Sequence, residues 1–181
     1  MRYAIGIFVV AATLTTAFAQ SRPSGPTARP NATSTASRAA VRPTPAKATV
    51  PTGPSPAEQS IFDSVNRERA ARQLKPLRWD AGLAAAARGH AQKMAQAGQI
   101  SHQVSGENDF AMRIRLAGVK FISVAENVAE APDVPMLHEE WMNSPPHRAN
   151  ILDPDLDMLG VSIIERNGEF FAVQDFALSI K

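Results

Sequence analysis

Residues 158–176, MLGVSIIERNGEFFAVQDF, constrain the fold more than any other stretch, because they predict a β-hairpin that is apolar on both faces. Asn167-Gly168 is a strong signal for a two-residue hairpin turn. On the first strand apolar side chains occupy both faces, with Leu159, Val161 and Ile163 on one and Met158 and Ile164 on the other. Since such a sheet must be covered on both sides, we expect an α+β fold, a three-layer α-β-α sandwich with a C-terminal antiparallel β-hairpin.

Four helices are predicted before this hairpin. Ser55-Pro56-Ala57-Glu58 reads as a capping box that starts the first helix. Asp80 would cap a second helix that ends at Gly98, a third spans roughly residues 109–117, and a fourth covers about 134–143. Pro145-Pro146 would end the fourth helix and fix the direction in which the following side chains emerge.

The composition divides the chain into three segments. Residues 1–19 carry Arg2, an apolar run too short to span a membrane, and Ala17-Phe18-Ala19, which together indicate a Sec-type signal peptide. Residues 20–57 are rich in Pro, Ser, Thr, Ala and Arg and predict a disordered linker. The folded domain is then 58–181, and the mature protein is expected to be secreted or periplasmic, with no transmembrane segment.

Charge and cysteine content exclude several classes of function. All 17 acidic residues lie at or after Glu58, together with 13 of the 19 basic residues, so the predicted domain carries a net charge of −4. This balance argues against nucleic acid as a partner. The basic linker could contact a cell-envelope polymer or lipid headgroups, or serve only as a solvated tether. With no cysteine, disulfides and thiolate chemistry are excluded.

Two of the four histidines are candidates for a binding site. His102 and His147 each follow the end of a predicted helix, and binding groups concentrate at such supported loop positions. His90 lies at the edge of the buried stripe of the second helix, which favours a packing or hydrogen-bonding role. His138 neighbours Glu139 and Glu140 and is expected to point to solvent.

Three local patterns do not support the sites that they suggest. His138-Glu139-Glu140-Trp141-Met142 lacks the second histidine of a zinc-protease motif. Residues 153–164 lack the glycine and the final glutamate of a calcium-binding loop. Ser144 lies three residues before His147, but no nucleophile-elbow turn surrounds it, so a serine hydrolase is a minor alternative.

Five short motifs, taken in order, resemble those of the bacterial SCP-like branch of the CAP superfamily, which includes cysteine-rich secretory proteins, antigen 5 and pathogenesis-related-1. They are Ile100-Ser101-His102, Arg113–Gly118, Ala125-Glu126-Asn127-Val128-Ala129, Trp141–Leu152, and Leu159-Gly160-Val161 with the hairpin that carries Gln174-Asp175-Phe176. The resemblance implies the α-β-α sandwich and a cleft where two histidines and two acids meet.

Carried over by position, the resemblance assigns His102 and His147 to the two histidine places and Glu126 to the glutamate of the Gly-Glu-Asn motif. Ala125 replaces the glycine of that motif, and Ser144 stands where many relatives have the second glutamate. The earlier Gly106-Glu107-Asn108 triplet resembles the same motif but precedes the third helix, and we do not assign it to the site.

The predicted cleft therefore contains His102, Glu126, Ser144 and His147, with His102 and His147 as metal ligands. Two imidazoles and water would hold a divalent cation, zinc or magnesium, only weakly. We predict a binding module for such a cation, for a lipid or envelope-derived ligand, or for both. A metal-dependent, protease-like hydrolase and a non-catalytic interaction protein are alternatives, and so is a purely structural hydrogen-bonded network; catalytic residues stay unassigned.

Overall fold

The computed structural model describes residues 53–180 of the 181-residue chain. The predicted signal peptide and most of the predicted linker lie outside these residues. Within them the chain forms five helices, α1 (Pro56–Ala70), α2 (Ala81–Ala97), α3 (Phe110–Leu116), α4 (Val134–Asn143) and α5 (Pro145–Ile151). It also forms four strands, β1 (Arg78–Trp79), β2 (Phe121–Ala131), β3 (Met158–Arg166) and β4 (Glu169–Ser179).

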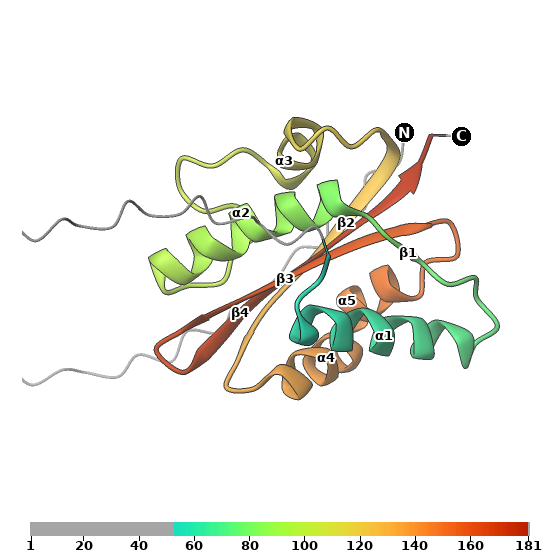
Figure 1. The fold of residues 1–181 in the computed structure, drawn as a ribbon, viewed down its shortest axis with the longest axis horizontal. Coiled ribbons are helices and arrows are strands. Elements are labelled where there is room, and N and C mark those ends of the chain that lie inside the picture. The colour runs from blue at the N-terminus through green and yellow to red at the C-terminus, as the bar shows by residue number, and fades with distance from the viewer. Residues whose placement is uncertain (1–52, 181) are drawn as a thin grey trace, which may run out of the picture. The chain divides into compact units, whose positions relative to one another are not determined.

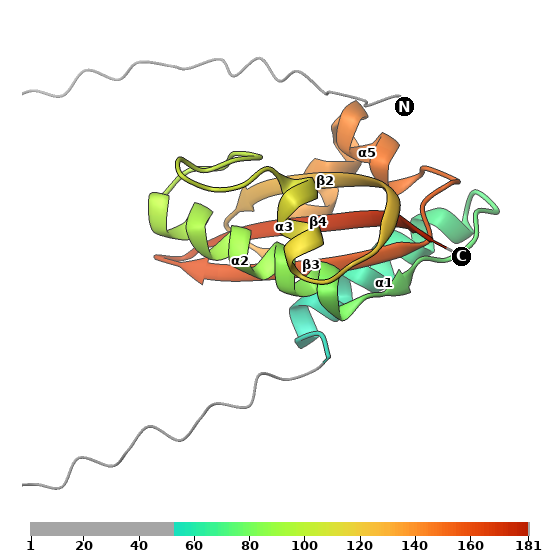
Figure 2. The same cartoon turned by 90° about the horizontal axis from the view of Figure 1, so that it is seen from above.

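The strands form one sheet with helices on both faces, as predicted. The strand order is β1-β3-β4-β2, in which β3 and β2 run antiparallel to β4, and β1 runs parallel to β3. Helices α2 and α3 lie on one side of the sheet, and α1, α4 and α5 lie on the other (Figure 1). The view from above shows β2, β4 and β3 side by side, with α3 in front of them (Figure 2). The three-layer α-β-α sandwich is therefore confirmed.

Each helical layer packs against the sheet through its own apolar core. Beneath α1, α4 and α5 the core includes Ile61, Leu137, Trp141, Ile151 and Phe176, all at most 2% exposed. Helix α2 contributes mainly alanines, Ala87, Ala91 and Ala95, to the core beneath it, where Met94 and Val173 are fully buried. Because alanine side chains are short, α2 can approach the sheet closely, and Gly160 on β3 faces its backbone.

Local signals in the sequence place most element boundaries correctly. Ser55 and Glu58 form the expected capping box, and Gly98 ends α2 in the left-handed conformation with φ 64°. Asn167 and Gly168 both have positive φ, as a type I′ hairpin turn requires. Because α1 begins at Pro56, the folded domain starts slightly before the boundary at residue 58 that composition suggests.

Three elements, β1, β2 and α5, were not predicted, and the last two position the site. Strand β2 is 11 residues long and pairs with β4 at the edge of the sheet, but its polar residues Glu126, Asn127 and Glu130 obscure a strand pattern. Helix α5 begins directly after α4, with the two prolines at its first positions, where a missing N–H costs nothing. The expectation that His147 lies in a loop is therefore wrong, since it lies in the first turn of α5.

Candidate functional site

His102 and Glu126 are in direct contact at the edge of the sheet. His102 lies in the loop between α2 and α3, and its Nδ1 is 2.9 Å from Oε1 of Glu126 on β2. The histidine side chain is 40% exposed, whereas that of Glu126 is 1% exposed. Arg113 of α3 forms a buried ion pair with the other carboxylate oxygen, Oε2. Glu126 is thus fixed from two sides. Its carboxylate accepts a hydrogen bond from the Nδ1–H group of His102.

A second acid lies beside Glu126 in the interior. Asp175 on β4 is the cross-strand partner of Glu126 and is fully buried. No group of the described residues donates a hydrogen bond to either of its carboxyl oxygens. Burial, and then the negative charge of Glu126, raises the pKa of Asp175 well above its usual range. The raised pKa favours the protonated form of Asp175, which can donate a hydrogen bond to Glu126.

The opposite face of β2 holds α5 through amide side chains. Nδ2 of Asn127 donates to the backbone oxygen of His147 at 3.1 Å and to Oε1 of Gln174 at 3.0 Å. Nδ2 of Asn150 on α5 donates to Oδ1 of Asn127 at 2.8 Å. Consecutive residues of one strand point to opposite faces, so Glu126 fixes the His102 side of the site while Asn127 fixes the His147 side.

The two candidate histidines interact electrostatically. Burial, and then the charge that His102 can carry, lowers the pKa of His147 to about 4. At neutral pH the ring of His147 is therefore neutral, which is the form that can bind a metal ion. The structure thus brings His102 into contact with Glu126 and His147 into electrostatic range of His102.

Two other positions considered in the sequence, Ser144 and His138, lie at the end of α4 and within it. Ser144 is both the C-cap of α4 and the N-cap of α5, and its side chain makes no capping hydrogen bond to α5. The prediction that His138 points to solvent is wrong, because α4 packs against α1 and leaves the ring half-buried. Burial lowers the pKa of His138, and the nearby charge of Glu68 opposes that effect.

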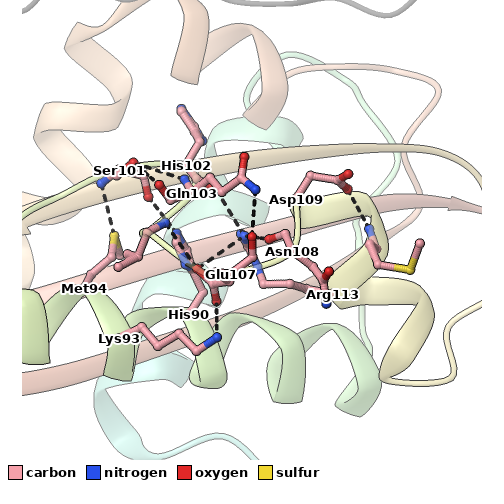
Figure 3. Close-up of polar contacts among 12 residues, drawn as sticks. His90, Lys93, Met94, Ser101, His102, Gln103, Glu107, Asn108, Asp109 and Arg113 are labelled. Atoms are coloured by element: carbon pink, nitrogen blue, oxygen red, sulfur yellow. Dashed lines mark hydrogen bonds and ion pairs between the residues drawn. The ribbon is translucent and has the colours of Figure 1, made fainter.

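A buried polar cluster beneath the His102 loop was only partly anticipated. His90 is fully buried and makes two hydrogen bonds, which confirms its predicted hydrogen-bonding role. One of its partners is Glu107, which the sequence motifs do not assign to the site and which lies 3.7 Å from Arg113 (Figure 3). Arg113 and Asp175 were also missed as site residues. The polar pair Gln174-Asp175 within an otherwise apolar strand is a sequence signal that could have found the second.

The residues present limit how a metal ion could be held. Within residues 53–180, no group of three or more His, Asp or Glu side chains is arranged to bind a metal ion. His102 and His147 would supply two ligands, and water would supply the others. Two surface hollows, of about 240 and 310 Å³, are lined by other residues, so the cleft at the histidines stays a prediction.

No helix in this part of the chain is long and apolar enough to cross a membrane.

Comparison with known proteins gives consistent relatives. The family described as "CAP: Cysteine-rich secretory protein family" matches residues 62–176. The uncharacterized protein YkwD of Bacillus subtilis is 31% identical over 116 residues, which are 64% of this chain and 45% of that protein. An uncharacterized membrane protein of the same organism, YlbC, is 33% identical over 59% of this chain and 31% of its own length. The matched part of the chain therefore spans less than half the length of each of these two relatives.

Solved structures show the same fold. An extracellular protein from Bacillus anthracis that contains an SCP domain is 30% identical, with a TM-score of 0.63 over 67% of this chain and 40% of that one. An outer surface protein of Borrelia burgdorferi has a TM-score of 0.64 at 21% identity, over 68% of this chain and 93% of that one. At that lower identity the second likeness concerns the fold alone.

Proposed function

The chain belongs to the CAP family of cysteine-rich secretory proteins, and we propose that it is a secreted binding domain whose His102 and His147 hold a divalent cation weakly. The contact between His102 and the buried carboxylate of Glu126 carries this proposal. Histidines that bind metal ions commonly donate their second ring N–H to a carboxylate, which fixes the tautomer and the ring orientation. When Nδ1 of a neutral His102 donates to Glu126, the lone pair is on Nε2, the atom that would bind the cation.

The charges of the surrounding residues favour weak, reversible binding. Arg113 offsets the negative charge of Glu126, and the raised pKa of Asp175 favours its neutral form, so the buried acids add little net attraction for a cation. His147 enters as a neutral ligand because burial keeps its pKa low. Two nitrogen ligands are fewer than the four of a structural zinc site, and water would complete the coordination shell.

A binding role fits these residues better than hydrolysis. A general base must reach the proton that it removes, directly or through one water molecule. Glu126 is 4% exposed, and its carboxylate is hydrogen-bonded to His102 and ion-paired with Arg113. Asp175 is fully buried. Neither acid can meet a substrate without rearrangement. A metal-dependent hydrolase is therefore the alternative to test rather than the preferred function.

Two relatives support a proposed location, and from that location we propose a second ligand class. The Bacillus anthracis relative is described as extracellular and the Borrelia protein as an outer surface protein. We extend this location to the present chain, where it agrees with the signal peptide predicted over residues 1–19. An envelope polymer or lipid is the ligand class that a cation-binding domain in this compartment would meet.

Calorimetric titration with zinc and with magnesium tests the cation site. We expect weak binding that becomes too weak to detect in His102→Ala and in His147→Ala, and that falls about 10- to 100-fold in Glu126→Gln. His138→Gln is the matched control, because His138 is a half-buried histidine on a different helix and should leave the affinity unchanged. Equal affinity in the wild type and in the double variant His102→Ala/His147→Ala would refute the site. Turnover of peptide, glycan or lipid substrates that is lost on chelation would favour the hydrolase.

A further inference from the structure

His90 has two hydrogen-bond partners, and both of them are acceptors. Its ring is fully buried on α2. Nδ1 is 2.7 Å from Oε2 of Glu107, and Nε2 is 2.7 Å from the backbone oxygen of Ser101 (Figure 3). Both partners belong to the loop that leads from α2 to α3 and carries His102. The histidine therefore connects a rigid helix to the loop that presents the candidate site.

The acceptors determine how many protons the ring carries. A carbonyl oxygen can only accept, so Nε2 must carry a hydrogen. Lys93 at 3.4 Å and Arg113 at 3.7 Å place two positive charges beside the carboxylate of Glu107, and these charges favour its ionised form. Glu107 is therefore ionised at neutral pH, and Nδ1 must carry a hydrogen as well. A ring that donates from both nitrogens is an imidazolium ion.

The loop depends on such polar anchors because it has few apolar ones. Ile100, its largest apolar residue, is 49% exposed. Besides the bond from His90, Nε2 of Gln103 donates to the backbone oxygen of Glu107 at 2.7 Å. Nη1 of Arg113 donates to the backbone oxygen of His102 at 3.1 Å. The cluster therefore binds the backbone on both sides of the site histidine.

We infer that His90 is a positioning residue: as a buried imidazolium ion it clamps Ser101 and Glu107 and thereby fixes the loop that presents His102. This inference rests on the proposed function only through the role given to His102. The charged group in contact with the ring is Glu107, and the carboxylate of Glu107 is also ion-paired with Lys93 and Arg113. If the ring lost one proton, one of its two hydrogen bonds would be lost, and the loop would be held only by its remaining anchors.

Nitrogen-resolved NMR of the histidine side chains in the full protein tests the protonation state directly, without any metal. We expect His90 to show two protonated ring nitrogens at neutral pH. His138 is the internal control, since burial lowers its pKa and it should show a neutral ring with one protonated nitrogen. A single protonated nitrogen on His90 at neutral pH would overturn the inference.

The variants His90→Gln and His138→Gln test the positioning role. In His90→Gln we expect at least tenfold faster amide exchange at Val104 and Glu107, with the exchange of β4 amides unchanged. Glutamine at position 138 should change neither. Loop exchange that equals the wild type in a folded His90→Gln protein would contradict positioning. Zinc affinity should also fall about tenfold in His90→Gln. A wild-type protein that binds no zinc would refute the cation site. The NMR and exchange results would still decide the role of His90 in that case.

Discussion

Replacing Arg69 with methionine should strongly destabilise the domain. Arg69 is on α1 and is fully buried, and its guanidinium donates to four backbone oxygens. Nε donates to Lys75 at 2.9 Å, and Nη1 donates to Ile151 at 2.9 Å and to Asp153 at 2.8 Å. Nη2 donates to Leu156 at 3.3 Å. One side chain thus ties α1 to the end of α5 and to the segment that leads into β3.

The magnitude follows from the burial of these acceptors. A buried carbonyl that loses its donor costs about 1–3 kcal/mol. The bonds to Ile151 and Leu156 are buried, whereas those to Lys75 and Asp153 are partly buried, and water can replace the donor there. Methionine restores part of the packing, and removing the charge relieves the desolvation that lowers the pKa of Arg69. We therefore expect a loss of about 3 kcal/mol in the free energy of unfolding.

Urea unfolding followed by tryptophan fluorescence measures this loss, since Trp141 is fully buried. The matched control is Arg67→Met, because Arg67 is exposed on the same helix and bonds only to the exposed hydroxyl of Ser64 among the described residues. The control should change the stability by less than about 0.5 kcal/mol. If Arg69→Met and Arg67→Met had equal midpoints and equal slopes, the assignment of Arg69 as the tie between α1, the end of α5 and the segment before β3 would be refuted.

Three further predictions concern the core, the helix–sheet contact and pH. Trp141→Ala should cost about 3–5 kcal/mol in urea unfolding, and a wild-type emission maximum typical of solvated indole would contradict its burial. Gly160→Ala should cost about 3 kcal/mol, because the added Cβ would lie 2.1 Å from the backbone nitrogen of Ala84, and an unchanged melting temperature would show that α2 can move away. Burial lowers the pKa of His147 to about 4, so the folded state binds fewer protons than the unfolded state between pH 4 and 6.5, and stability should fall as pH falls through this range. His147→Gln should remove that part of the pH dependence, whereas the raised pKa of Asp175, which acts in the opposite direction, is present in both proteins.

The sequence determined the elements whose signals are local. The capping box at Ser55, the left-handed cap at Gly98 and the turn at Asn167 are read from neighbouring residues, and all three are present. The two apolar faces of the hairpin then required helices on both sides of the sheet. Such features could be predicted because the groups that stabilise them lie within a few residues of each other along the chain.

The tertiary structure alone decided which polar residues surround His102. Glu126 meets Asp175 only because β2 pairs with β4, and it meets Arg113 only because α3 packs over that edge of the sheet. The polar residues of β2 also hid the strand itself, since a period-2 pattern is lost where both faces carry site residues. The pKa shifts of Asp175 and His147 likewise depend on burial and on partners distant along the chain, and a local pattern of residues contains neither.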